Sequence, residues 1–295
     1  MRALAAPASL KEVLSAADAA DALAEGLRRG GAEAYALAVA DGGDGTLDVL
    51  HGALGGEWRS ARVTAPLGGQ VGARYVVLPG NTVLLGTAEA LGFATVPRLD
   101  PLRASSRGLG ELIRAAAPGA DELLVCLGGT VTVDGGAGMR EVLVELPCPT
   151  RVLCDVLNPL LDAVYVFAAQ KGATPDQFPV LEERLSGLPD VPGAGAAGGV
   201  GGALAALGAT LVAGARLVLD LIGFDPRGYD LVVTGEGAVD ETTFTGKAPG
   251  EVVRRCEAAG VRCHLFSARD DLSGETARAR EDLVALGERL GSSLR

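Results

Sequence analysis

The amino-acid sequence predicts an α/β protein in which a parallel-sheet domain carries a second, inserted domain. Strand, loop and helix follow one another twice within the first 54 residues, and the chain closes on similar units. Between them, from Arg62 to Leu85, Val, Tyr, Thr and Gly alternate with turn signals at Pro66 and Pro79. That pattern is typical of short antiparallel strands. With 295 residues, the chain is long enough for two domains.

The first elements are those of a parallel sheet. Residues 3–6 and 35–40 are apolar runs, which we expect to form buried strands. Ser9 and Glu12 have the spacing of a capping box, so we expect a helix that begins at Ser9 and ends at Gly30. A second helix is expected over residues 47–54.

The later elements follow from the same patterns of apolar runs and helical stripes. Strands are expected over residues 122–127, 151–156, 230–234 and 264–267. Helices are expected over residues 108–117, 177–188, 203–221, 248–259 and 274–294, with a Gly-rich loop over residues 191–202. The helix over residues 203–221 is interrupted by Gly208 and Gly214. A change of composition near Arg59–Val63 predicts a domain boundary. We therefore assign residues 1–60 and 225–295 to the parallel-sheet domain and residues 61–224 to the inserted domain.

Charge and cysteine content limit the partners. The net charge of −11 opposes binding to nucleic acid and to anionic lipid, so we expect neither nucleic acid nor membrane as a partner. Five cysteines without a C-x-x-C pair argue against a zinc site or a disulfide framework and suit the cytoplasm. The N-terminal apolar run is too short for a signal peptide. The uncharged stretch over residues 191–215 is mostly Gly and Ala, so we interpret it as loop and helix rather than a membrane span.

Three loops that follow predicted strands combine glycines with carboxylates: residues 41–46, 128–138 and 235–240. Glycine lets backbone N–H groups approach a phosphate, and carboxylates can hold Mg²⁺ beside it. Ligands of open α/β sheets bind beyond the carboxyl ends of the strands. The three loops together therefore favour Mg-nucleotide chemistry over ordinary tight turns.

The common nucleotide motifs are absent. No P-loop occurs, because Glu241 stands where its first Gly would be. Residues 193–198 spell G-x-G-x-x-G, but no strand precedes them, so we reject a dinucleotide fingerprint. No Gly-x-Ser-x-Gly motif is present.

Lysine is scarce: the chain has 26 basic residues, of which only Lys11, Lys171 and Lys247 are lysines. Because the two basic side chains differ in chemistry, this scarcity favours sites that need a compact ammonium. Lys11 is predicted in the first turn of its helix, where the helix dipole disfavours a cation. A phosphate or carboxylate held there would explain it, and a solvated surface lysine is the alternative.

Several segments resemble the type I glycerate kinases, which transfer the ATP γ-phosphate to D-glycerate. The matching segments begin Ala-Pro-x-Ser-x-Lys11-Glu and Ala40-Asp-Gly-Gly-Asp-Gly-Thr. They continue with Ser105-Ser-x-Gly-x-Gly-Glu, Gly128-Gly-Thr-x-Thr-x-Asp134-Gly-Gly-Ala-Gly-Met and Cys154-Asp-Val-x-Asn158-Pro-Leu. The last are Gln170-Lys-Gly-Ala, Pro192-Gly-Ala-Gly-Ala-Ala-Gly-Gly and Val233-Thr-Gly-Glu-Gly-x-x-Asp240 with Gly246-Lys247. All three lysines fall inside these motifs.

The resemblance implies a Rossmann-like domain with a second α/β domain inserted and the active site in the cleft between them. It implies ATP and Mg²⁺ as cofactors and D-glycerate or a similar hydroxy acid as the small-molecule substrate. A homodimer is left open. Catalytic roles fall to Lys11, Asp41 and Asp134. Substrate contacts fall to Ser9, Asp155, Asn158, Gly42 and Gly43. Nucleotide or phosphate contacts fall to Gly128, Gly129, Thr130, Lys171, Gly235, Glu236 and Lys247. Metal contacts fall to Asp134, Glu236 and Asp240.

The chain departs from the family pattern at four motif positions. Ala8 replaces an Asp, Gly86 a Glu, Val133 an Asn and Thr242 a Gln. Two alternatives to a glycerate kinase therefore stay open. One is a catalytically weak or inactive paralogue that binds a nucleotide or metabolite, and the other is a kinase of another small hydroxy acid.

Overall fold

The computed structural model describes residues 1–10, 13–273 and 275–294 and confirms the α/β class. The chain forms two compact units, each with its own core. Unit 1 comprises residues 1–41, 48–53 and 218–295, and unit 2 comprises residues 42–47 and 54–217. The units are defined by packing alone, so the predicted domain limits at residues 60 and 225 remain a prediction.

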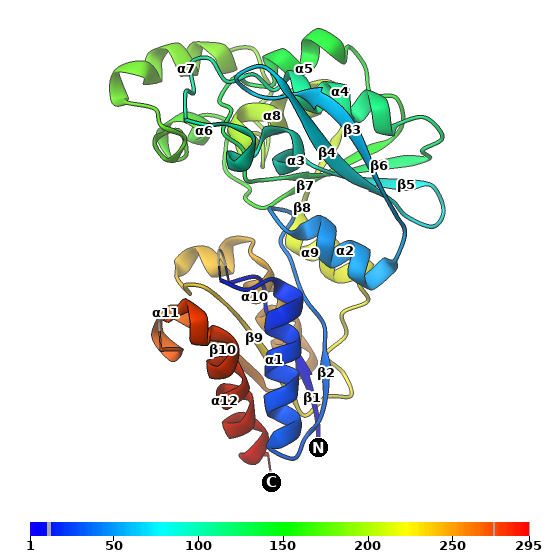
Figure 1. Ribbon diagram of the computed structural model, residues 1–295, viewed down its shortest axis with the longest axis vertical. Coiled ribbons are helices and arrows are strands. Elements are labelled where there is room, and N and C mark those ends of the chain that lie inside the picture. The colour runs from blue at the N-terminus through cyan, green and yellow to red at the C-terminus, as the bar shows by residue number, and fades with distance from the viewer. Residues whose placement is uncertain (11–12, 274, 295) are drawn as a thin grey trace. The chain divides into compact units, whose positions relative to one another are not determined.

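Unit 1 is built on a parallel sheet, as predicted for the ends of the chain (Figure 1). Its strand order is β10-β9-β1-β2, with β1 (Arg2–Ala5), β2 (Glu33–Ala36), β9 (Leu231–Glu236) and β10 (Cys263–Ser267). Its helices are α1 (Ala16–Arg29), α10 (Ala248–Ala259), α11 (Ala268–Asp271) and α12 (Ala279–Ser292), with 3₁₀ turns η4 (Glu241–Thr245) and η5 (Thr276–Arg278). Crossover helices of this kind are what parallel strands require.

Helices α1 and α12 lie side by side in Figure 1 and pack through glycines. A Cβ built on Gly26 would lie 2.0 Å from the carbonyl oxygen of Val284, and one on Gly287 would lie 2.5 Å from that of Leu23. Only hydrogen at these positions permits the observed spacing. The two helices therefore approach one another backbone to backbone.

Unit 2 contains a mixed sheet in the order β3-β4-β5-β6-β7-β8. Its strands are β3 (Glu57–Thr64), β4 (Gln70–Val77), β5 (Thr82–Gly86), β6 (Glu122–Leu127), β7 (Thr150–Cys154) and β8 (Thr210–Ala213). The first three strands pair antiparallel, as predicted, and β5 to β8 pair parallel. Polar residues thus follow the carboxyl ends of adjacent strands, where ligands of such sheets bind.

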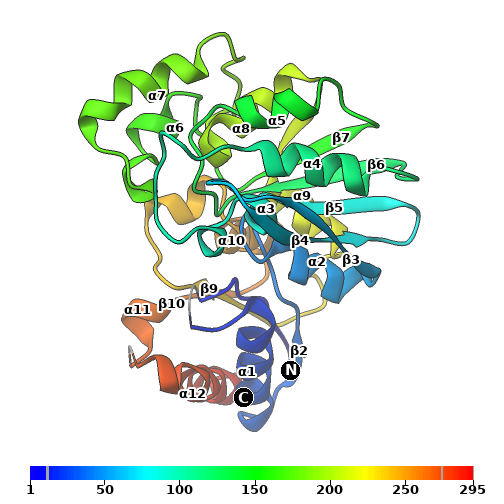
Figure 2. The same cartoon turned by 45° about the horizontal axis from the view of Figure 1, so that its top comes forward.

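The helices of unit 2 are mostly short. They are α3 (Thr87–Leu91), α4 (Arg107–Ala116), α5 (Ala137–Val142), α6 (Asp162–Tyr165), α7 (Phe178–Leu185) and α8 (Ala196–Ala206), with 3₁₀ turns η1 (Phe93–Thr95), η2 (Ala169–Lys171) and η3 (Pro175–Gln177). Figure 2 shows α4 and α5 packed together over the sheet. Helices α2 (Thr46–Leu54) and α9 (Gly214–Leu221) have residues in both units. No helix of the described chain combines the length and apolar character needed to cross a membrane.

Several predicted elements are wrong in their limits. The strand predicted over residues 35–40 covers Glu33–Ala36, and α12, predicted from residue 274, begins at Ala279. Helix α1 begins at Ala16, with Ser15 as its N-cap, because the Ser15 hydroxyl accepts a hydrogen bond from the Asp18 N–H at 3.1 Å. Among the described residues no helix begins at Ser9, and the amides of Val13 and Leu14 donate to the Leu10 carbonyl.

A further error is the helix predicted over residues 203–221, in which Gly208 and Gly214 were expected only as interruptions. Gly208 adopts a φ of +94° and ends α8, after which β8 pairs with β7 before α9 begins. The predicted Gly-rich loop is also shorter than expected. Ala197, Gly198 and Gly199 are left-handed, but the chain is helical from Val200.

Candidate functional site

The predicted site residues divide into two groups, one on each unit. On unit 2, three motif segments meet around Gly128, directly after β6. A Cβ at Gly128 would lie 2.8 Å from the Gly43 Cα and 3.0 Å from a carboxylate oxygen of Asp155. Gly128 is therefore required by close approach rather than by a turn alone. The next residue, Gly129, has a φ of +64° and is exposed, so its amide lies at the accessible edge of this cluster.

Thr87 anchors Gly128 and was not predicted as part of the site. Its buried hydroxyl donates to the Gly128 carbonyl at 2.9 Å and accepts from the Gly128 N–H at 3.0 Å. Thr87 is the first residue of α3 and lies 41 residues before Gly128. No local pattern links the two residues, and only the parallel pairing of β5 with β6 brings them together.

Asp134 lies in the same loop but is turned into the protein. Its carboxylate accepts four hydrogen bonds, from the Ser106 N–H and hydroxyl and from the amides of Gly136 and Gly138, at 2.7 to 3.1 Å. Three of these hydrogen bonds end on Oδ2 and one on Oδ1, so the lone pairs of Oδ2 are fully used. Asp134 thereby joins the start of α4 to the start of α5. Ser106, from the motif that begins at Ser105, donates two of the four hydrogen bonds to Asp134.

Lys171 is also enclosed, since only 4% of the residue is exposed. Its Nζ donates to the Thr132 carbonyl at 2.9 Å and to the Thr130 hydroxyl at 3.2 Å. Burial lowers the pKa of Lys171 to about 8, against the opposing effect of the carboxylates of Asp155 and Asp134. The Thr132 hydroxyl is buried without a hydrogen-bond partner, alone among the side chains of the described residues.

The remaining predicted residues of unit 2 border this cluster. Gly42 is buried, and its N–H donates to the Thr46 hydroxyl at 3.1 Å. Asn158 is half-buried, and its amide donates to a carboxylate oxygen of Asp162 at 2.6 Å. The Asn158 carbonyl accepts a hydrogen bond from the Gly195 N–H at 3.3 Å, which ties this segment to the Gly-rich loop.

The group on unit 1 is centred on Glu236, the last residue of β9. One Glu236 oxygen accepts from the Thr243 hydroxyl at 2.6 Å, and the other forms an ion pair with Lys247 Nζ at 3.2 Å. Lys247 is partly exposed, unlike Lys171. The preceding Gly235 has no room for a Cβ, which would lie 2.3 Å from the Phe266 ring. Strand β9 and the segment after it thus hold one cation beside one carboxylate.

Asp240, Asp41 and Ser9 complete this group. Asp240 is exposed and caps η4, and hydrogen bonding from Thr242 lowers the pKa of its carboxyl. Asp41 and Ser9 are both half-buried. Lys11 was predicted as a catalytic residue, and it lies outside the described residues.

The carboxylates do not form a protein cage for a metal. Among the residues that the structure describes, no group of three or more His, Cys, Asp or Glu side chains could hold an ion. Mg²⁺ in nucleotide sites commonly uses one or two carboxylates together with substrate phosphates and water. Asp134 is poorly suited to that role because four donors already occupy it. Glu236 suits it better, since each of its oxygens accepts one observed hydrogen bond and keeps a lone pair. Asp240 suits it better because it is exposed, whereas Asp134 is buried.

The four departures from the family pattern have distinct surroundings. Val133 is fully buried in the core of unit 2, and a Cβ on Gly86 would lie 3.1 Å from Leu47. Ala8 donates its N–H to the Gly235 carbonyl at 2.9 Å. Thr242 is exposed and hydrogen-bonded to Asp240. Val133 and Gly86 therefore fit local packing without a polar partner.

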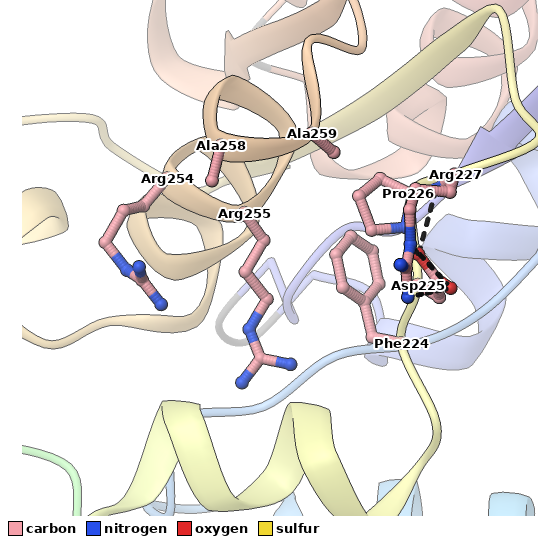
Figure 3. A pocket seen from close by; sticks show the side chains of 8 residues that line it. All are labelled: Phe224, Asp225, Pro226, Arg227, Arg254, Arg255, Ala258 and Ala259. Atoms are coloured by element: carbon pink, nitrogen blue, oxygen red, sulfur yellow. Dashed lines mark hydrogen bonds and ion pairs between the residues drawn. The ribbon is translucent and has the colours of Figure 1, made fainter.

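A separate pocket of about 330 Å³ lies on unit 1, away from the predicted site residues in sequence. Figure 3 shows Arg254 and Arg255 projecting from α10 and Arg227 paired with Asp225. Arg254 and Arg255 both pair with Glu251, and Arg255 also with Asp220. Each guanidinium is therefore neutralised by a carboxylate, and the pocket offers little surplus charge for phosphates.

Known proteins resemble this chain over most of its length. A model of the glycerate kinase family matches residues 3–145 and 143–286. Glycerate 2-kinase of Escherichia coli K12 is 36% identical over an alignment of 305 positions. The alignment covers 84% of this chain and 80% of that protein. Glycerate kinase of Bacillus subtilis 168 is 36% identical over 317 residues, covering 88% and 83%.

A solved structure agrees with this. The structure, from Salmonella typhimurium LT2 and provisionally named glycerate kinase 2, superposes with a TM-score of 0.82 at 31% identity. The match covers 100% of this chain and 98% of that one. These likenesses confirm the resemblance stated from the motifs, and with it the enzyme class, a phosphotransferase. The chain belongs to the glycerate kinase family.

Proposed function

We propose that this protein is an ATP- and Mg²⁺-dependent glycerate kinase that transfers the γ-phosphate of ATP to a hydroxyl of D-glycerate. The observation that carries the proposal is the cluster of Gly43, Gly128 and Asp155 on unit 2, in a chain of the glycerate kinase family. Three motifs far apart in sequence supply this cluster. Curated relatives that are about a third identical bear the names glycerate kinase and glycerate 2-kinase, which supports glycerate as the acceptor.

The proposed roles follow from the chemistry of each group. Phosphoryl transfer needs positioning and charge neutralisation more than covalent chemistry. Exposed backbone at Gly129 and the partly exposed ammonium of Lys247 suit nucleotide phosphates. Asp155, Asn158, Gly42, Gly43 and Ser9 are the proposed contacts of glycerate. Asp41 is the proposed acceptor of the hydroxyl proton, and Lys11 the proposed cation beside a phosphate or the glycerate carboxylate.

Glu236 and Asp240 are the proposed protein contacts of Mg²⁺. When bound, the ion would neutralise charge on the nucleotide phosphates. Glu236 also pairs with Lys247, which holds the carboxylate at the end of β9. Asp134 is left out of this set on geometric grounds, and a structural role for it is proposed instead. A cytoplasmic location is proposed from the cysteine content alone.

Direct assay tests the function. Purified protein is incubated with ATP, Mg²⁺ and D-glycerate, and ADP is measured together with 2- and 3-phosphoglycerate, which chromatography separates. We expect phosphoglycerate in step with ADP, and the name of the E. coli relative favours the 2-phosphate. Asp41→Asn should lower kcat by roughly 100-fold or more if Asp41 accepts the proton. Turnover of another hydroxy acid but not of glycerate would replace the proposal by a kinase of that acid. Turnover of no hydroxy acid would replace it by an inactive, ligand-binding paralogue.

A further inference from the structure

Lys171 occupies a position that the backbone fixes firmly. It ends η2, and the Lys171 N–H donates to the Ala168 carbonyl at 3.0 Å. The next residue, Gly172, has a φ of +90°, and a Cβ there would lie 2.8 Å from Leu99. Because Gly172 both reverses the chain and packs tightly, the motif Gln170-Lys-Gly-Ala173 directs the lysine inward.

The ammonium of Lys171 donates hydrogen bonds to groups of the protein itself. An ammonium has three donors, and Lys171 uses two of them on the Thr132 carbonyl and the Thr130 hydroxyl. Thr130 and Thr132 are themselves 2% and 0% exposed. A phosphate would have to reach a side chain that is 96% covered, since Lys171 is only 4% exposed.

These contacts hold the loop that follows β6. Thr130 lies two residues after Gly128, whose Cα region touches Gly43 and Asp155. On the other side, the Val131 N–H donates to the Leu91 carbonyl at 2.9 Å. The loop is therefore held by three sets of contacts, and Lys171 provides the only one of these three that comes from a charged donor.

We infer that Lys171 is a positioning residue that holds residues 128–132 in place and does not bind nucleotide phosphate itself. This inference rests on the proposed function, because the expected fall in kcat refers to the phosphorylation of glycerate. Removal of the ammonium leaves the buried Thr132 carbonyl without the Lys171 donor and removes a positive charge that interacts with the carboxylates of Asp155 and Asp134. The exposed edge at Gly129 would then move, while the nucleotide contacts on unit 1 would stay.

The test uses the full-length chain and two substitutions. Lys171→Met keeps the length of the side chain, and Thr130→Val removes one acceptor of Nζ without changing charge. In both variants we expect faster hydrogen–deuterium exchange over residues 128–133 and unchanged exchange over residues 235–247. We also expect kcat to fall at least about tenfold while the Kd of Mg·ATP changes less than about threefold.

Two further variants complete the design. Thr130→Ser keeps the hydroxyl and should retain at least about half of the wild-type kcat, which a loss of packing alone would not explain. Lys247→Met should weaken Mg·ATP binding more than Lys171→Met does. Exchange over residues 128–133 that is unchanged in both Lys171→Met and Thr130→Val overturns the inference. So does a loss of Mg·ATP affinity in Lys171→Met as large as in Lys247→Met. If the wild type does not phosphorylate glycerate, the proposed function fails, but exchange still decides the role of Lys171.

Discussion

Asp134 shows how one carboxylate can be either a metal ligand or a structural joint. Its two oxygens receive four donors, so an amide in its place would present an NH₂ group to at least one N–H. Burial makes such a mismatch costly. We therefore expect Asp134→Asn to lower the free energy of unfolding by roughly 1–3 kcal/mol.

Chemical denaturation of both proteins measures this difference. Asp240→Asn is the matched control, because Asp240 is exposed, and its stability should change by less than about 0.5 kcal/mol. If Asp134→Asn is as stable as the wild type and loses only its dependence on Mg²⁺, Asp134 is a metal ligand after all.

Lys171 should make stability depend on pH in a defined direction. Its pKa is lowered from 10.5 to about 8 by burial, so the unfolded chain binds the proton more tightly than the folded one. The resulting penalty is complete below pH 8 and disappears as the pH rises through the unfolded value. Between pH 7 and pH 10, the wild type should therefore gain roughly 2 kcal/mol relative to Lys171→Met.

Denaturation curves of the two proteins at both pH values give this difference and cancel the other titrating groups that they share. A constant difference across the range would mean that the ammonium titrates normally. Burial of the charged Lys171 thus lowers the stability of the fold near neutral pH. In the proposed role, the same lysine holds the loop after β6 in place.

At the scale of elements, the contact of α1 with α12 depends on glycine. Gly26→Ala would place a Cβ 2.0 Å from the Val284 carbonyl oxygen, so the helices must separate. We expect a loss of about 1–3 kcal/mol in the free energy of unfolding, as for other overpacked cores. Gly52→Ala is the control, since nothing lies within 4 Å of its Cβ position in α2, and it should stabilise by up to about 1 kcal/mol.

Elements with strong local signals were predicted well. The strand over residues 122–127 and the helix over residues 248–259 agree with β6 and α10 residue for residue. The strand β8 was missed because Thr210–Ala213 carries no local signal apart from its flanking glycines. Its existence depends on pairing with β7, which is a tertiary contact. The start of α1 was misplaced because the prediction rested on the capping-box spacing of Ser9 and Glu12, whereas Ser15 is the N-cap in the structure.

For the whole molecule, the motifs identified the family and the loops, but not the direction of their side chains. That Gly128, Gly43 and Asp155 meet depends on the strand order, which was not predicted from the sequence. The inward turn of Asp134 and Lys171 depends on partners 28 and 39 to 41 residues away. The family resemblance marked both residues as site contacts, and it carried no information on whether their side chains are buried. Their burial supports the structural roles proposed for both residues within the family motifs.

Nucleotide binding should be measurable on the whole protein even where turnover is slow. The glycines of the loops and the partly exposed Lys247 are present, whereas the departures at Ala8, Gly86 and Val133 remove polar groups. A ligand that binds only the folded state stabilises it by RT ln(1 + [L]/Kd), about 2.7 kcal/mol at a hundredfold excess over Kd. We therefore expect Mg·ATP at millimolar concentration to raise Tm by several degrees, and D-glycerate alone to raise it little.

Differential scanning fluorimetry and calorimetry provide the measurement, with Lys247→Met as the variant that should lose most of the shift. A wild type whose Tm and binding heat do not respond to Mg·ATP would leave the chain with the fold and ancestry of the family but without its nucleotide site.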